Sequence, residues 1–67
     1  MKKSPDQIEV GEIFQYEDPN GNTQKRTAKE PPRRLEFDGH FLGWMVLAEE
    51  GFGTTPIQLR GEVEIVD

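Results

Sequence analysis

Few residues of this 67-residue chain could take part in catalysis or bind a metal ion. His40 is the single histidine, in the stretch FDGHF, and the chain contains no cysteine. A zinc site needs several histidine, cysteine or carboxylate ligands, so a lone histidine cannot complete one. We interpret His40 as a turn residue that its aromatic neighbours half bury, with a catalytic or pH-sensing role as the alternative.

The acidic side chains include two close pairs that could act as a general acid and a general base. Glu49 and Glu50 are neighbours in a predicted strand and therefore point to opposite faces. Glu62 and Glu64 share a face, but it is the polar face of the last predicted strand. A carboxylate needs a water-poor pocket for its pKa to reach a catalytic value, and a fold this small has little room for one. The sequence therefore predicts solvated carboxylates and no enzyme activity.

The stretch EDPNGN could supply oxygen ligands to a cation. The residues concerned are Glu17, Asp18, Asn20 and Asn22. The stretch lacks the ligand number and the closing glutamate of a calcium loop, and a tight turn already accounts for its composition. The stretch GFG likewise lacks the form of a phosphate-binding loop. We expect no metal ion and no cofactor.

The basic residues are concentrated in the stretch KRTAKEPPRR at positions 25–34. It holds five of the eight lysines and arginines and one glutamate, which gives it a net charge of +4. Residues 1–24 carry −3 and residues 35–67 carry −6, so the whole chain carries −5. Such a distribution usually means that charges compensate one another across the protein's own surface, because nucleic-acid-binding proteins are more often basic overall.

Two prolines, Pro31 and Pro32, lie within the basic stretch. Each removes a backbone donor, so neither a helix nor a central strand can run through them. We therefore predict an exposed connector that follows a hairpin, with Arg33 and Arg34 placed where acidic strands partly neutralise them. Arginine can also bind a carboxylate through two N–H groups, so the same loop could receive an acidic patch of a partner protein.

The hairpin before this connector is predicted by the stretch EIFQYEDPNGN. Its β-branched and aromatic residues indicate a strand, and PNG suits a turn that ends in a left-handed glycine. Asp18 then faces Asn22 across the turn. This register places Phe14 opposite Arg26, and it sends Lys25 and Arg26 to opposite faces of the second strand.

Further strands are predicted after the connector. RLEF alternates, with Leu35 and Phe37 inward and Glu36 outward, and DG marks a turn. HFLGWMVLAEE is almost continuously apolar, as expected of a central strand covered on both faces. Glycines on both sides of Phe52 predict a flexible turn, which leaves Phe52 either exposed or folded back as a lid over one end of the fold.

The last segment alternates between apolar and polar residues from position 57 onward. Gly61 falls on the apolar parity, so it is either a bulge in one long strand or the corner between two strands. The predicted core consists of Trp44, either Val46 or the pair Met45 and Leu47, and Ile57, Leu59, Val63 and Ile65.

These elements predict one all-β domain. We expect a flexible N-terminus at residues 1–7 and a single small domain at residues 8–67, because a chain this short buries too little surface for two cores. Five to six short strands with tight turns predict an antiparallel barrel or sandwich. The layout is similar in outline to SH3-like small barrels, with an OB-like barrel as the second choice, and such folds have many unrelated functions.

The longest apolar run is too short for a membrane helix, and MKK is not followed by an apolar signal region. We expect a cytoplasmic protein without membrane contact. Our first hypothesis is a non-enzymatic protein-interaction module, a small accessory, regulatory or inhibitory protein that binds a protein partner through loops and an exposed strand edge. The candidate contact residues are Arg33, Arg34, Phe41 and Phe52.

The alternative hypothesis is a small nucleic-acid-binding protein. Lys25, Arg26 and Lys29 would contact phosphates, and Tyr16 would stack on bases. The net charge of −5 and the acidic segments on both sides of the basic stretch disfavour this hypothesis, because they repel phosphate.

Overall fold

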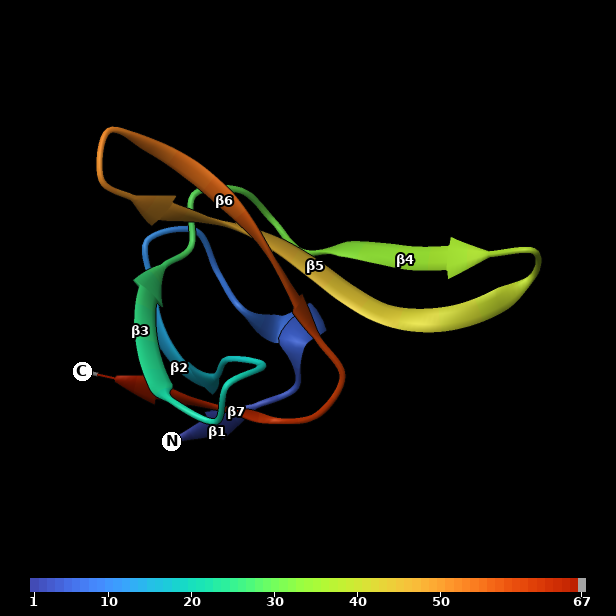
Figure 1. Ribbon diagram of the computed structural model, residues 1–67, viewed down its shortest axis with the longest axis horizontal. Coiled ribbons are helices and arrows are strands. Elements are labelled where there is room, and N and C mark those ends of the chain that lie inside the picture. Colours follow the sequence, from blue (N-terminus) through green and yellow to red (C-terminus); the bar gives the residue numbers. More distant parts are fainter. Residues whose placement is uncertain (67) are drawn as a thin grey trace.

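The computed structural model describes residues 1–66, and these residues form an all-β structure with seven strands and one short 3-10 helix (Figure 1). The elements in chain order are β1 (Lys2–Lys3), η1 (Pro5–Gln7), β2 (Ile13–Glu17), β3 (Thr23–Thr27), β4 (Arg33–Phe37), β5 (His40–Glu50), β6 (Gly53–Leu59) and β7 (Val63–Val66).

The strands form two antiparallel sheets, one with the order β1-β7-β2-β3 and one with the order β4-β5-β6. Ala28, just beyond β3, makes an isolated bridge to Ala48 of β5 and so links the sheets. The predicted all-β, antiparallel class is confirmed. The two sheets do not close into a barrel. β4 pairs with the first half of β5, away from the bridge at Ala48, and within residues 1–66 no other strand pairs with β4.

The β2–β3 hairpin has the predicted register, in which Phe14 faces Arg26. Asp18 and Asn22 close the turn through a backbone hydrogen bond of 2.9 Å, and Gly21 has a positive φ of 85°. Turn type and strand register in a hairpin depend on residues close together in the sequence, so the sequence could predict this register to the single residue.

The core is one cluster of buried apolar side chains from both sheets. It consists of Ile8, Phe14, Ala28, Val46, Ala48, Ile57, Leu59, Val63 and Ile65. The four predicted positions of β6 and β7 are confirmed, and the structure selects Val46 over the pair Met45 and Leu47, which are half-buried. Gly61 lies at the corner between β6 and β7. Phe14, which we did not assign to the core, is the larger of the two bulky side chains with no exposed surface.

The assignment of Trp44 to the core was wrong, because its side chain is only half-buried. Trp44 pairs with Leu59, the last residue of β6, so the sheet ends beside it. Its ring makes a T-shaped contact with Phe41, at 6.0 Å between ring centres.

The strand β5 is longer than its neighbours, with 11 residues against 5 in β4 and 7 in β6. Its pairing with β6 begins at Trp44, so residues 40–43 pair with β4 alone. Residues 33–43 therefore form a hairpin, here called the arm, that projects from the rest of the molecule (Figure 1). The expectation that β5 is a central strand is confirmed, but its first residues are exposed on the arm.

The predicted inward position of Phe37 was also wrong, because its side chain is 74% exposed near the end of the arm. Leu35 is half-buried and Glu36 is exposed. Within residues 1–66 no strand covers this part of β4, so the alternation of its side chains does not produce a buried face.

Residues 1–7, for which we expected no regular structure, contain β1 and η1. β1 pairs with β7, and the Ile65 N–H donates to the Met1 carbonyl oxygen at 2.7 Å. Pro5 is buried, and Lys3 makes an ion pair with Glu12 at 2.9 Å. A two-residue strand carries no hydrophobic pattern, so the sequence offered no signal for it.

Within residues 1–66, no helix has the length and apolar character needed to cross a membrane.

Candidate functional site

The arm ends in a tight turn at Asp38 and Gly39, which have positive φ values of 52° and 79°. Positive φ at both central residues is the geometry of a two-residue hairpin turn, and Asp-Gly suits it. Three large apolar side chains are exposed on the arm: Phe37, Phe41 and Leu42. None of the core side chains belongs to the arm, so it does not help to bury the core.

One face of the arm combines aromatic and charged side chains. Arg34 pairs with Trp44 across the strands, and Glu36 pairs with Phe41. The register shifts between these two pairs, and Leu42 of β5 is the extra residue. This bulge brings Phe41 to the same face as Trp44, although the two are separated by an odd number of positions. The guanidinium carbon of Arg34 then lies 4.3 Å from the centre of the Phe41 ring.

The base of the arm is fixed to β6. The carbonyl oxygen of Leu42 accepts hydrogen bonds from Gln58 Nε2 at 2.7 Å and from Arg60 Nε at 3.1 Å. Gly43 has a φ of 120°, and a Cβ atom there would lie 2.7 Å from the carbonyl oxygen of Leu59. The close approach of β5 to β6 therefore requires glycine.

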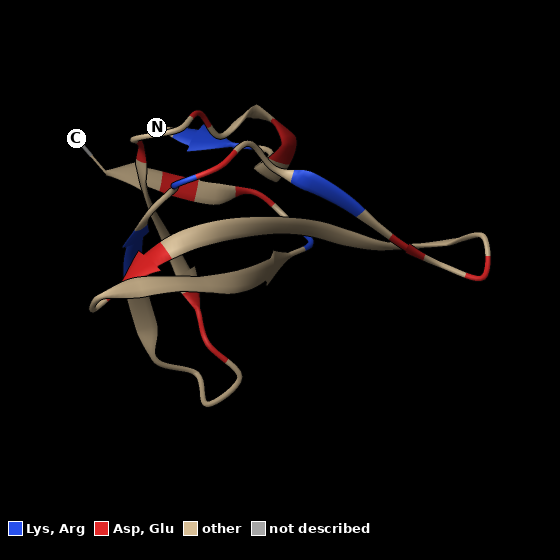
Figure 2. Cartoon of the chain, turned by 90° about the horizontal axis from the view of Figure 1, so that it is seen from above, with Lys and Arg blue, Asp and Glu red and all other residues tan. Residues whose placement is uncertain are grey.

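Both arginines of the predicted partner site have a carboxylate neighbour on the same chain. Arg33 pairs with Glu30 at 3.3 Å, and Arg34 pairs with Glu36. These carboxylates do not come from separate acidic strands, as we predicted: Glu30 lies in the loop before β4, and Glu36 lies on β4 itself. All four side chains are largely solvated, and exposed ion pairs contribute about 0 to 1 kcal/mol, so a partner's carboxylate could replace either one. Figure 2 shows the basic base of the arm followed by acidic positions toward its tip.

The structure brings Arg34 and Phe41 together but separates them from Phe52. Phe52 lies in the β5–β6 turn, at the opposite end of β5 from the arm, and its side chain is fully exposed. Of the two alternatives that we considered, the exposed turn is therefore correct and the lid is not. Arg33 lies at the start of β4, beside Arg34.

The basic stretch is not a connector over its whole length. Lys25 and Arg26 belong to β3, and Arg33 and Arg34 begin β4, so only residues 29–32 form the loop between the strands. The two prolines lie in this loop, as their missing donors require.

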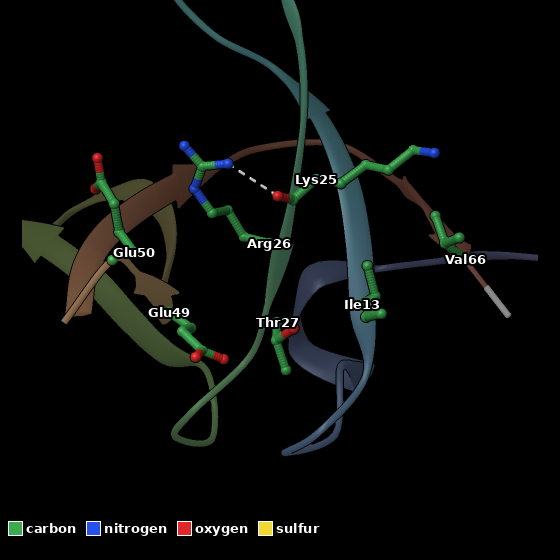
Figure 3. A pocket seen from close by; sticks show the side chains of 8 residues that line it. Ile13, Lys25, Arg26, Thr27, Glu49, Glu50 and Val66 are labelled. Carbon is green, nitrogen blue, oxygen red and sulfur yellow. Dashed lines mark hydrogen bonds between the residues drawn. The ribbon is translucent and has the colours of Figure 1, made fainter. Parts of the chain in front are cut away.

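The basic residues of the alternative nucleic-acid site share their surroundings with carboxylates. Lys25 and Arg26 point to opposite sides of β3, as expected (Figure 3). Lys29 makes an ion pair with Glu49 at 3.3 Å. Tyr16 is half-buried and packs against the core, with its ring 5.8 Å from that of Phe14.

A hollow of about 590 Å³ lies beside β3 and the end of β5 (Figure 3). Its charged lining residues are Lys25, Arg26, Glu49 and Glu50. The guanidinium of Arg26 donates from one terminal nitrogen to the Lys25 carbonyl oxygen at 2.9 Å, and its buried Nε has no hydrogen-bond partner within the described residues. Two acidic and two basic side chains leave the hollow without an excess of positive charge for phosphate.

The remaining polar candidates have structural roles. Asp18 accepts hydrogen bonds from the N–H groups of Asn20 and Asn22 and from Gln24 Nε2, and these bonds, led by that from Asn22, lower the pKa of Asp18. His40 begins β5 and is exposed, not half-buried as expected, because the arm has no layer beneath it. Across residues 1–66, no three histidine or acidic side chains come together in a way that could hold a metal ion.

Sequence reasoning missed the arm as a unit, and with it Phe37, Leu42 and Trp44. A signal was present in the strand lengths, because a strand of 11 residues cannot be covered along its whole length by neighbours of 5 and 7 residues. Comparisons with protein-family models, with curated proteins and with solved structures gave no significant match to this chain.

Proposed function

We propose that this chain is a non-enzymatic protein-interaction module, a small cytoplasmic accessory or regulatory protein, and that the arm is its protein-binding element. The observation that supports this proposal is the exposure of Phe37, Phe41 and Leu42 on a projecting hairpin that contributes nothing to the core. Phe41 lies on the face of the arm that Arg34 and Glu36 share, and Phe37 lies on the opposite face, so each face presents an exposed aromatic side chain. Aromatic side chains and arginine are the residues that most often dominate the binding free energy of protein-binding sites.

The arm is well suited to bind with a small loss of conformational freedom. Its turn has the φ values of a regular two-residue hairpin, and its base is held by the hydrogen bonds from Gln58 and Arg60 to Leu42. A segment that is ordered before binding loses less entropy when it binds, so more of the contact free energy appears as affinity.

Affinity capture with matched variants tests this proposal. We would immobilise the wild-type chain, the Phe37→Ser/Phe41→Ser variant and the Phe52→Ser variant, and expose each to cell lysate with and without nuclease treatment. Phe52→Ser is the control, because it removes an exposed aromatic at the other end of β5. The wild type and the control should retain the same proteins, and the arm variant should lose them.

Two results would contradict the proposal. If the arm variant retains the same proteins as the wild type, the arm is not the binding element. If the retained set disappears after nuclease treatment, the nucleic-acid hypothesis is the better one, and affinity should then fall steeply with salt, by about 0.9 log units per log unit of salt for each duplex phosphate contacted.

A further inference from the structure

The outer edge of β4 differs from the other strand edges of the molecule. β4 ends its sheet, and within residues 1–66 no strand pairs with its outer side. Such an edge presents unpaired backbone N–H and C=O groups, and natural proteins usually protect it with charged side chains, above all lysine, with proline, with a bulge or with a very short strand. The other three edge strands have these features: β6 contains Pro56, β3 contains Lys25, and β1 has two residues. β4 has five residues and neither proline nor lysine, and its three charged residues, Arg33, Arg34 and Glu36, include both signs.

We propose that the outer edge of β4 pairs with β4 of a second copy of this chain, in antiparallel orientation about a twofold axis at Leu35. This inference rests on the proposed function and names the partner of the same arm. The two three-stranded sheets would join into one sheet with the order β6-β5-β4-β4-β5-β6.

The charge pattern of β4 favours this register. With Leu35 opposite Leu35, Arg34 faces Glu36 of the second copy, and Glu36 faces the second copy's Arg34. Opposite charges at directly facing positions stabilise antiparallel strands, and like charges destabilise them. A twofold axis at Arg34 would instead place the two copies of Arg34 face to face, and an axis at Glu36 would do the same with the two glutamates. The register centred on Leu35 avoids both.

The other face of β4 is also complementary to itself in this register. Arg33 lies opposite Phe37 of the second copy, which allows the guanidinium to cover an aromatic ring that is 74% exposed in the single chain. The two copies of Leu35 face each other at the twofold axis, between the two Arg33–Phe37 pairs. The proposed pairing therefore covers the most exposed apolar side chain of the arm and leaves no like charges in contact.

A charge exchange between two variants tests the pairing. Arg34→Glu and Glu36→Arg would each place like charges opposite one another at both symmetry-related positions of a homodimer. In an equimolar mixture of the two variants, every facing pair again joins a carboxylate to a guanidinium. Lys25→Glu on β3 is the matched control, because it reverses a charge on a different edge strand.

The measurement is sedimentation equilibrium over a range of protein concentrations at low salt, with circular dichroism to show that each variant is folded. The wild type and the control should move from 7.7 kDa toward twice that mass as concentration rises. Each arm variant alone should need roughly tenfold higher concentration or more to associate. The mixture, and the Arg34→Glu/Glu36→Arg double variant, should recover the behaviour of the wild type.

Three outcomes would overturn the inference: a wild type that is monomeric up to about 1 mM, single variants that associate like the wild type, or a mixture that does not recover association. The affinity capture experiment measures binding to other proteins and is independent of these three outcomes. A monomeric wild type whose arm still retains proteins from lysate would reject self-pairing and leave the proposed function standing. A dimer whose Phe37→Ser/Phe41→Ser variant retains every protein would reject the proposed function alone.

Discussion

The guanidinium carbon of Arg34 lies 4.3 Å from the centre of the Phe41 ring, across the two strands of the arm. The same guanidinium pairs with Glu36, and the ring makes an edge contact with Trp44. These contacts join one residue pair of β4 to two aromatic side chains of β5. The arm therefore carries a defined arrangement of side chains.

This contact predicts a measurable coupling between Arg34 and Phe41. In a double-mutant cycle of Arg34→Ala and Phe41→Ala, the coupling free energy should be about 0.5 to 1 kcal/mol, because both groups are partly exposed to water. Urea denaturation at a low protein concentration, where the chain is monomeric, gives the four free energies of unfolding. Strictly additive effects would show that the contact does not stabilise the fold.

The positions of Phe14 and Trp44 predict very different costs of truncation. Phe14→Ala removes the larger of the two bulky side chains with no exposed surface and should cost about 3 to 5 kcal/mol, close to the whole stability of a small domain. Phe14→Leu, at about 1 kcal/mol, provides a variant that still folds. Trp44→Ala should cost clearly less than Phe14→Ala, because the indole is half-buried. Thermal denaturation of the three variants measures this order, and a larger loss for Trp44→Ala would return Trp44 to the core.

The contrast between these two residues shows which parts of the fold the sequence predicts. The β2–β3 turn and the alternation from Ile57 to Ile65 follow from local rules of turn geometry and strand periodicity. The choice between Phe14 and Trp44 depends on which strands face one another. That choice is set by contacts distant in sequence, such as the bridge between Ala28 and Ala48.

The same distinction applies to the candidate site. Arg33, Arg34 and Phe41 were identified by residue type, since exposed arginines and aromatics are common in interfaces. These residues lie with Phe37 on one projecting hairpin because β6 ends opposite Trp44 and leaves the start of β5 paired with β4 alone. Phe52 has the same residue type and lies at the other end of β5, which composition alone cannot distinguish.

Gly43 is predicted to be the most sensitive glycine of the chain. Gly43→Ala would place a Cβ atom 2.7 Å from the Leu59 carbonyl oxygen at a residue whose φ is 120°. The expected loss of stability is about 1 to 3 kcal/mol, the usual cost of one strained backbone position. Gly53→Ala is the control, because no atom lies within 4 Å of its added Cβ, and it should change the free energy of unfolding by about 0.5 kcal/mol or less. Equal effects of the two substitutions in chemical denaturation would contradict the proposed close approach.

The ion pair between Lys3 and Glu12 predicts an acid-dependent part of the stability. The hydrogen bond from the Glu9 N–H at 2.8 Å, together with the Lys3 ammonium, holds the pKa of Glu12 below its ordinary value of 4.5. A carboxyl whose pKa is lower in the folded state releases its proton more readily there than in the unfolded chain. Its contribution to stability is therefore complete above pH 4.5 and is lost as the pH falls through the lower, folded value.

Glu12→Gln should remove this contribution. Its melting temperature should lie below that of the wild type at neutral pH, and the two should converge as the pH falls below 4.5. Glu62→Gln is the control, because it removes the same charge from an exposed residue in the corner between β6 and β7. Since Glu12 and Lys3 fix the N-terminal segment to the body of the protein, Glu12→Gln should also speed amide exchange at Ile65, whose N–H donates to Met1. A difference in melting temperature that stays constant from neutral to acid pH would show that the Glu12 charge does not contribute, and that the substitution acts through packing alone.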